Sequence, residues 1–214
     1  MRMRVTATAT ARYGVRLGAS RRPLAVRSER RADGTQTMTA PSDDDRERVR
    51  SYLLGQGEKY SWLELWPRVV GARVALLDAV SGVSEEQAAF HPAEGDWSIA
   101  EVVHHVVGGS RGTARVIERL AEGETPPETV RTDPAREPAG ASFEELRRDL
   151  AADSVNFASL ASRLPEPPSL EGTHPHMFFG DLHCRAWYLF QRVHDQDHAG
   201  QIAAIQQAAG YPEA

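Results

Sequence analysis

The sequence contains almost no cysteine and no long apolar segment, and both absences narrow the class of protein. Its single cysteine, Cys184, excludes an internal disulfide and a thiolate-rich zinc site, and such a low cysteine content is typical of the reducing cytoplasm. No run of about eighteen apolar residues occurs, so no membrane-spanning helix is predicted. Neither an alternating strand pattern nor an internal repeat can be found. We therefore expect a cytoplasmic protein without a β-sheet core.

Charge is distributed unevenly along the chain. Residues 1–37 hold nine arginines and two acidic residues, a net charge of +7, whereas the remainder holds 16 basic and 28 acidic residues, a net charge of −12. An acidic folded part repels phosphate backbones, so nucleic-acid binding is not expected. The basic segment resembles a transit peptide in composition. We expect a disordered leader over residues 1–41, with Met38 as an alternative native start, and one folded domain over residues 42–214.

Apolar periodicity and capping residues predict one short helix followed by four long ones. The helices cover roughly residues 45–57, 61–80, 98–122, 142–163 and 181–209. Ser98 and Ser142 each begin a capping box, with a glutamate three residues later. Pro67 either kinks the second helix or marks its true first turn. Four long helices with one long, proline-rich connection before Ser142 predict an all-α four-helix bundle.

The last predicted helix carries two histidines one turn apart. His194 and His198 are four residues apart, so they lie on one helical face and could bind a single transition metal. The metalloprotease motif with this spacing contains a glutamate that is missing here, which argues against a metalloprotease. Two histidines at this spacing also occur on ordinary helices, so a third ligand from elsewhere is needed to decide.

Several short motifs, in a fixed order, accompany this histidine pair. They are Trp97-Ser98 with Glu101 and His105, then His174-Pro175, Phe179-Gly180 and Leu182, and finally His194, His198, Gln201 and Ile202. Together they resemble the DinB/YfiT-like superfamily of four-helix-bundle metalloproteins, over roughly residues 60–210. The resemblance implies a bundle of the up-down-down-up type.

The resemblance also implies one divalent metal bound by His105, His194 and His198. Three neutral imidazoles suit such an ion and leave coordination positions open for water or a substrate atom. Zinc and nickel are the expected ions, with iron and manganese as alternatives. His104 lies about 100° around the helix from His105, so we expect it to be a surface or packing residue.

Three further residues are expected to lie around the metal rather than on it: Gln201, Glu101 and His176. Gln201 follows His198 by one turn, and could hydrogen-bond a ligand, a metal-bound water or the opposing helix, with helix packing slightly favoured. Asp195 and Asp197 lie off the ligand face, and we expect them to be solvated.

Relatives in the superfamily include S-transferases that use low-molecular-weight thiols such as bacillithiol and mycothiol. The resemblance therefore implies a metal-dependent thiol S-transferase that acts on a small molecule in detoxification or stress response, and it is compatible with a homodimer. A metal-dependent hydrolase and a non-catalytic metal-binding bundle remain open as alternatives. The sequence assigns neither a proton-transfer residue nor a thiol-binding motif.

Overall fold

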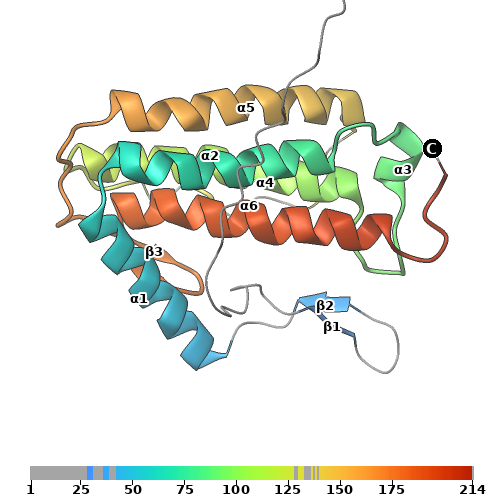
Figure 1. The fold of residues 1–214 in the computed structure, drawn as a ribbon, viewed down its shortest axis with the longest axis horizontal. Helices are drawn as coiled ribbons and strands as arrows, with labels where there is room; N and C mark the ends of the chain where they lie inside the picture. The colour runs from blue at the N-terminus through green and yellow to red at the C-terminus, as the bar shows by residue number, and fades with distance from the viewer. Residues whose placement is uncertain are drawn as a thin grey trace, which may run out of the picture.

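A computed structural model describes residues 28–30, 36–38, 42–127, 130–132, 136, 138 and 140–213 (Figure 1). Its helices are α1 (Asp43–Lys59), α2 (Trp62–Ala79), α3 (Glu85–Ala89), α4 (Ile99–Ala121), α5 (Phe143–Arg163) and α6 (Cys184–Gln206). Its strands are β1 (Ser28–Arg30), β2 (Gln36–Met38), β3 (Thr173–His176) and β4 (Gly180–His183). The predicted leader over residues 1–41 lies outside the described residues, except for β1 and β2, which pair in antiparallel fashion.

The four long helices α2, α4, α5 and α6 form the bundle. Helix α6 packs against α2 and α4, and α5 packs against the same two helices from the other side. In Figure 1, α2 and α6 run in one direction while α4 and α5 run in the other. The connection over residues 122–142 is therefore the crossover between two parallel helices. This arrangement confirms the predicted four-helix bundle.

Serine side chains begin most of the helices. Ser61, Ser84, Ser98 and Ser142 all form complete capping boxes, in which the hydroxyl accepts a backbone N–H and a glutamate or glutamine side chain accepts the serine N–H. Each such cap stabilises its helix by about 1 kcal/mol. Both predicted boxes are confirmed. Since α2 begins at Trp62, Pro67 lies in its second turn, and the alternative that Pro67 marks the first turn is wrong.

The segment before the last helix is a β-hairpin, and the expectation that the chain contains no strand is wrong at this point. Thr173 pairs with His183 and His176 pairs with Gly180 in antiparallel register. Consequently α6 begins at Cys184 rather than at Asp181, and Nδ1 of His183 accepts the backbone N–H of Ala186 as its N-cap (3.2 Å). Each strand has only four residues, too few for an alternating pattern to be visible in the sequence.

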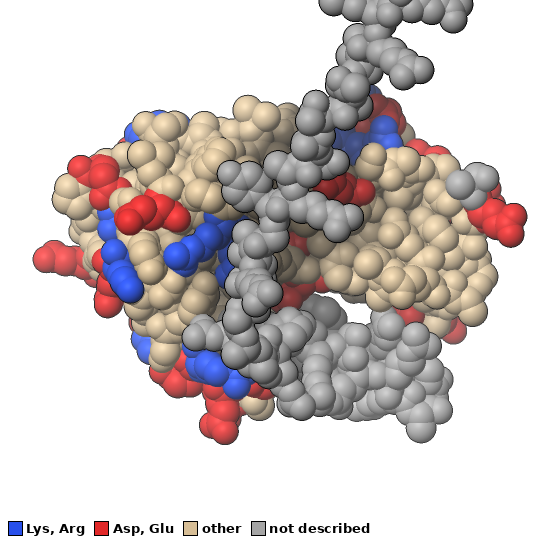
Figure 2. Space-filling model, in the orientation of Figure 1, with Lys and Arg blue, Asp and Glu red and all other residues tan. Residues whose placement is uncertain are grey.

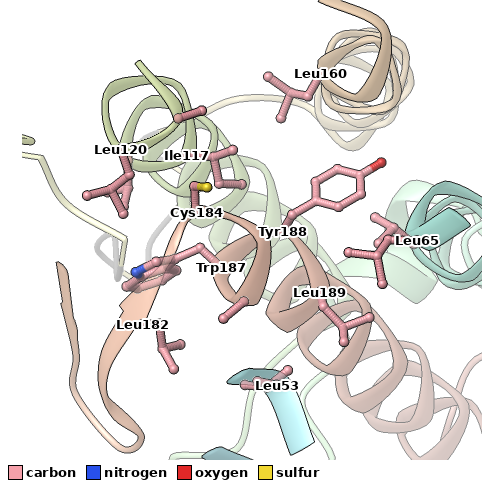
Figure 3. Packing of buried hydrophobic residues seen from close by; sticks show 14 of the residues in the cluster. Leu53, Leu65, Ile117, Leu120, Leu160, Leu182, Cys184, Trp187, Tyr188 and Leu189 are labelled. Carbon is pink, nitrogen blue, oxygen red and sulfur yellow. The ribbon is translucent and has the colours of Figure 1, made fainter. Parts of the chain in front are cut away.

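Helix α6 forms the centre of the core (Figure 3). Trp187 and Tyr188 are fully buried, and the Tyr188 ring stacks on Phe157 and meets Trp62 edge-on, with ring centroids 5.6 and 5.4 Å apart. Figure 3 shows that Trp187 and Tyr188 leave α6 in different directions, so one helix anchors several neighbours. Burial raises the pKa of Tyr188 well above its ordinary value.

Charged side chains of both signs are interspersed on the face shown in Figure 2, and the described residues form no continuous basic area there. None of the helices in the described part of the chain is both long enough and apolar enough to cross a membrane.

Candidate metal centre

Three histidines meet where α4 and α6 pack against each other. His105 lies in the second turn of α4, and His194 and His198 lie one turn apart on α6. One ring nitrogen of each lies within 4.8 Å of the others, so the three residues form a cluster that could hold a metal ion. The structure therefore brings together the three residues that the sequence predicted. His104 is half-buried and is not part of this cluster.

One pair of these nitrogens has the separation expected of two ligands of a transition metal. Nε2 of His105 lies 3.3 Å from Nε2 of His194. Zn–N bonds of about 2.0–2.1 Å at tetrahedral angles separate two ligand nitrogens by about 3.3–3.4 Å. Among the described residues, no fourth histidine, cysteine or carboxylate joins the group, so a bound ion would keep coordination positions open.

Gln201 fixes the orientation of His198. The Nδ1 of His198 lies 2.9 Å from Oε1 of Gln201, which accepts the ring N–H and leaves Nε2 to face the cluster. The sequence left open whether Gln201 contacts a ligand or packs against another helix, and the structure places it on a ligand. Which end of a glutamine amide is the oxygen is assigned from its hydrogen-bond partners. Here the amide oxygen faces Nδ1 of His198, which leaves Nε2 available to bind a metal.

The environment keeps His198 uncharged. Burial lowers the pKa of His198 far below its ordinary value, and the neighbouring His194 and His105 lower it further. Only the neutral imidazole offers a lone pair to a metal, so the folded chain presents His198 in the form that an ion requires at neutral pH.

Aromatic rings flank the cluster on two sides. Trp97 meets His105 edge-on at a centroid distance of 5.3 Å, and Phe190 lies 5.7 Å from His194. His176 is buried under Phe190, with their ring centroids 4.3 Å apart, and its Nδ1 accepts the backbone N–H groups of Phe178 and Phe179. Burial lowers the pKa of His176 to about 4. His176, predicted to lie around the metal rather than on it, packs behind Phe190 and is not part of the three-histidine cluster.

Glu101 serves the start of α4. Its carboxylate accepts the backbone N–H of Ser98 (2.8 Å) and an N–H of Arg136 (2.9 Å). Burial, the largest single effect, raises the pKa of Glu101, but the bonds from Arg136 and Ser98 together lower it below its ordinary value. The Arg136 guanidinium also covers the Trp97 ring at 5.3 Å. Glu101 therefore holds the crossover connection against the helix that carries His105.

A buried cluster of charged side chains, Arg73, Asp153 and Asp195, lies next to the histidines and was not predicted from the sequence. Arg73 donates from Nε to Asp195 (2.8 Å), from Nη1 to Asp153 (2.9 Å) and from Nη2 to Ser110 (3.0 Å). Asp195 is completely buried, so the expectation that it is solvated is wrong. The sequence carries a signal for Arg73 and Asp153, because both interrupt apolar helical stripes.

Comparison with known proteins agrees with the fold and with the superfamily that the sequence motifs resemble. A family model described as the DinB superfamily matches residues 68–202, and this chain belongs to that superfamily. Among solved structures, the chain is similar to the crystal structure of TT2238, a four-helix bundle protein, with 24% sequence identity and a TM-score of 0.52. The match covers 67% of this chain and 99% of the other, and at this identity it supports the fold alone. No curated protein matches the chain.

Proposed function

We propose that the chain is a cytoplasmic metal-dependent S-transferase that joins a low-molecular-weight thiol of the bacillithiol or mycothiol type to a small electrophile. The observation that supports it best is the cluster of three imidazoles from only two helices, with no fourth protein ligand among the described residues. When bound there, a divalent ion such as zinc or nickel supplies Lewis acidity that lowers the pKa of a thiol or of water.

The chain's own residues supply position and shape. His105 and His194 set the ligand spacing, and Gln201 holds the ring of His198. Trp97 and Phe190 are half-buried beside His105 and His194 respectively, where they offer apolar surface to the electrophile.

The metal centre is tested first. Purified chain is expected to hold about one divalent ion, and His105→Ala, His194→Ala and His198→Ala are each expected to lose it while the fold is retained. His104→Ala is the matched control, because it removes the adjacent histidine of the same helix. Unchanged metal content in all three variants, measured by plasma mass spectrometry, would contradict the assignment.

The chemistry is tested on the metal-loaded chain. A panel of thiols with monochlorobimane is expected to give conjugation that disappears in His198→Ala. If the metal is bound but no thiol reacts, hydrolysis of ester and amide substrates separates a hydrolase from a non-catalytic metal-binding bundle.

We also propose that two copies of the chain associate through α2 and α5. Four large apolar side chains are exposed there, namely Leu63, Trp66, Val74 and Val155. A groove of about 350 Å³ with mainly apolar walls runs between Val70 and Val155. Helices of 18 and 21 residues are about 27 and 31 Å long, so the apolar side chains are spread along an extended two-helix face to which the same face of a second copy could pack.

A further inference from the structure

The buried cluster of Arg73, Asp153 and Asp195 carries more negative than positive charge. Its three side chains are at most 5% exposed, and one guanidinium faces two carboxylates. An excess of one negative charge is costly in a dry interior unless another cation lies close by. The half-exposed Arg111 guanidinium acts on Asp153. On the side of Asp195, neutral imidazoles supply no positive charge, whereas a divalent ion held by them would.

Asp195 is the member of this cluster that reaches the histidines. Its Oδ1 lies 3.9 Å from Nδ1 of His194, while its Oδ2 accepts the bond from Arg73. Gln191, one turn earlier, donates to the same Oδ1 (2.7 Å), and its amide nitrogen lies 3.4 Å from Nδ1 of His194. Asp195 is thus fixed from two directions directly beside a predicted ligand.

Metal-binding histidines commonly donate their second ring N–H to a carboxylate or carbonyl oxygen, which orients the ring. His198 has such an acceptor in Gln201. For His194, Oδ1 of Asp195 lies 3.9 Å from Nδ1, beyond direct hydrogen-bond distance, and the amide nitrogen of Gln191 contacts both atoms, at 2.7 and 3.4 Å. A rotation of the imidazole that brings Nδ1 to this oxygen would give His194 a buried carboxylate partner, whereas His198 has a neutral amide.

We propose that Asp195 is a positioning residue of the metal centre: held by Arg73 and Gln191, its carboxylate orients His194 and compensates the charge of a divalent ion. This inference rests on the proposed metal centre and is independent of the thiol chemistry. The excess negative charge would then serve the metal centre as well as hold α2, α5 and α6 together.

Two variants of the full chain separate this role from a purely structural one. Asp195→Asn and Asp153→Asn each remove one carboxylate charge from a partner of Arg73 at similar depth, but only Asp195 lies beside His194. Both are expected to lower the melting temperature by similar amounts. Asp195→Asn is expected to weaken Zn(II) binding by roughly 10–100-fold and to change the Co(II) absorption spectrum. Asp153→Asn is expected to weaken Zn(II) binding by less than about 10-fold and to leave the Co(II) spectrum unchanged.

Equal losses of Zn(II) affinity in the two variants, or no loss in Asp195→Asn, would overturn the proposal. A wild-type chain that binds neither ion contradicts the metal centre itself, before any variant is compared. If Asp195→Asn does not fold, NMR of the wild-type chain with ¹⁵N-labelled histidine decides. A slowly exchanging proton on Nδ1 of His194 in the Zn(II) complex supports the proposal, and a rapidly exchanging one overturns it.

Discussion

An imidazole binds a metal through one ring nitrogen, and the hydrogen-bond partner of the other nitrogen determines which one is available. In His198 that partner is Gln201, whose amide oxygen lies 2.9 Å from Nδ1. Without it, Nδ1 would lose its acceptor in a buried position and the ring could adopt the other tautomer. Metal affinity should therefore depend on Gln201 although it is not a ligand.

Gln201→Leu is expected to weaken Zn(II) binding by roughly 10–100-fold, as measured by competition with a chromophoric chelator. Gln206→Leu is the control on the same helix, because it also removes one side-chain hydrogen bond, from Nε2 to the carbonyl of Ala79 (2.9 Å). A similar loss in both variants would mean that Gln201 acts through helix stability alone.

The ligand histidines could be predicted from the sequence because their spacing within each helix is local, and the family motifs supplied the link between His105 and α6. The partners of Arg73 could not be predicted, since Asp153 and Asp195 meet it only after three helices have packed. What the sequence does show is a charged residue on an apolar stripe. Arg73 follows Val69 by four residues and precedes Leu76 by three, and both of these are buried.

At the scale of the elements, α1 packs tightly against the hairpin and the start of α6. A Cβ at Gly57 would lie 2.5 Å from Cε1 of His183 and 2.9 Å from the backbone nitrogen of Ala186. At Gly55, in the same helix, a Cβ would meet nothing within 4 Å. Position 57 therefore has no room for a larger side chain, whereas position 55, two residues earlier in the same helix, does.

Gly57→Ala is expected to reduce the free energy of unfolding by about 1–3 kcal/mol, because the added methyl group overfills the contact. Gly55→Ala is expected to raise it by about 0.5–1 kcal/mol through better helix propensity. Urea unfolding followed by circular dichroism measures both. Stabilisation by both substitutions would show that α1 does not pack against the start of α6.

Helices were predictable as elements because each long one combines an apolar period with a serine cap. The hairpin was not, since Thr173-His174-Pro175-His176 contains a proline and lacks alternation, and its pairing with β4 supplies what the local sequence does not. The same hairpin brings His176 under Phe190, a ring that also contacts His194.

At the scale of the whole molecule, buried histidines should make the fold sensitive to acid. The folded-state pKa of His176 is about 4 against an ordinary value of 6.5, so the unfolded chain takes up this proton first as the pH falls. The contribution of His176 to the free energy of unfolding is therefore fully present above about pH 6.5. It decreases by about 3 kcal/mol as the pH falls towards 4. His176→Gln is expected to flatten the dependence of unfolding free energy on pH in EDTA.

The association of two copies is tested by placing a charge on the α2–α5 face. Val155 is 73% exposed there, and Met177, in the turn of the β3–β4 hairpin, is 69% exposed. Val155→Arg is expected to convert a dimer to a monomer in sedimentation velocity, because a buried unpaired cation disfavours the interface. Met177→Arg should not change the sedimentation coefficient. Monomeric wild-type chain at micromolar concentration would refute the dimer.

Because the first of the three histidines lies on α4 and the other two on α6, the cluster joins residues 89 positions apart in the chain. The last potential ligand is therefore synthesised long after the first, and the three histidines meet only when α6 docks against α4. A cluster of this kind would take up its ion after folding, as a formed site that competes with other chelators. An ion retained through purification would then report that a given molecule has completed its fold.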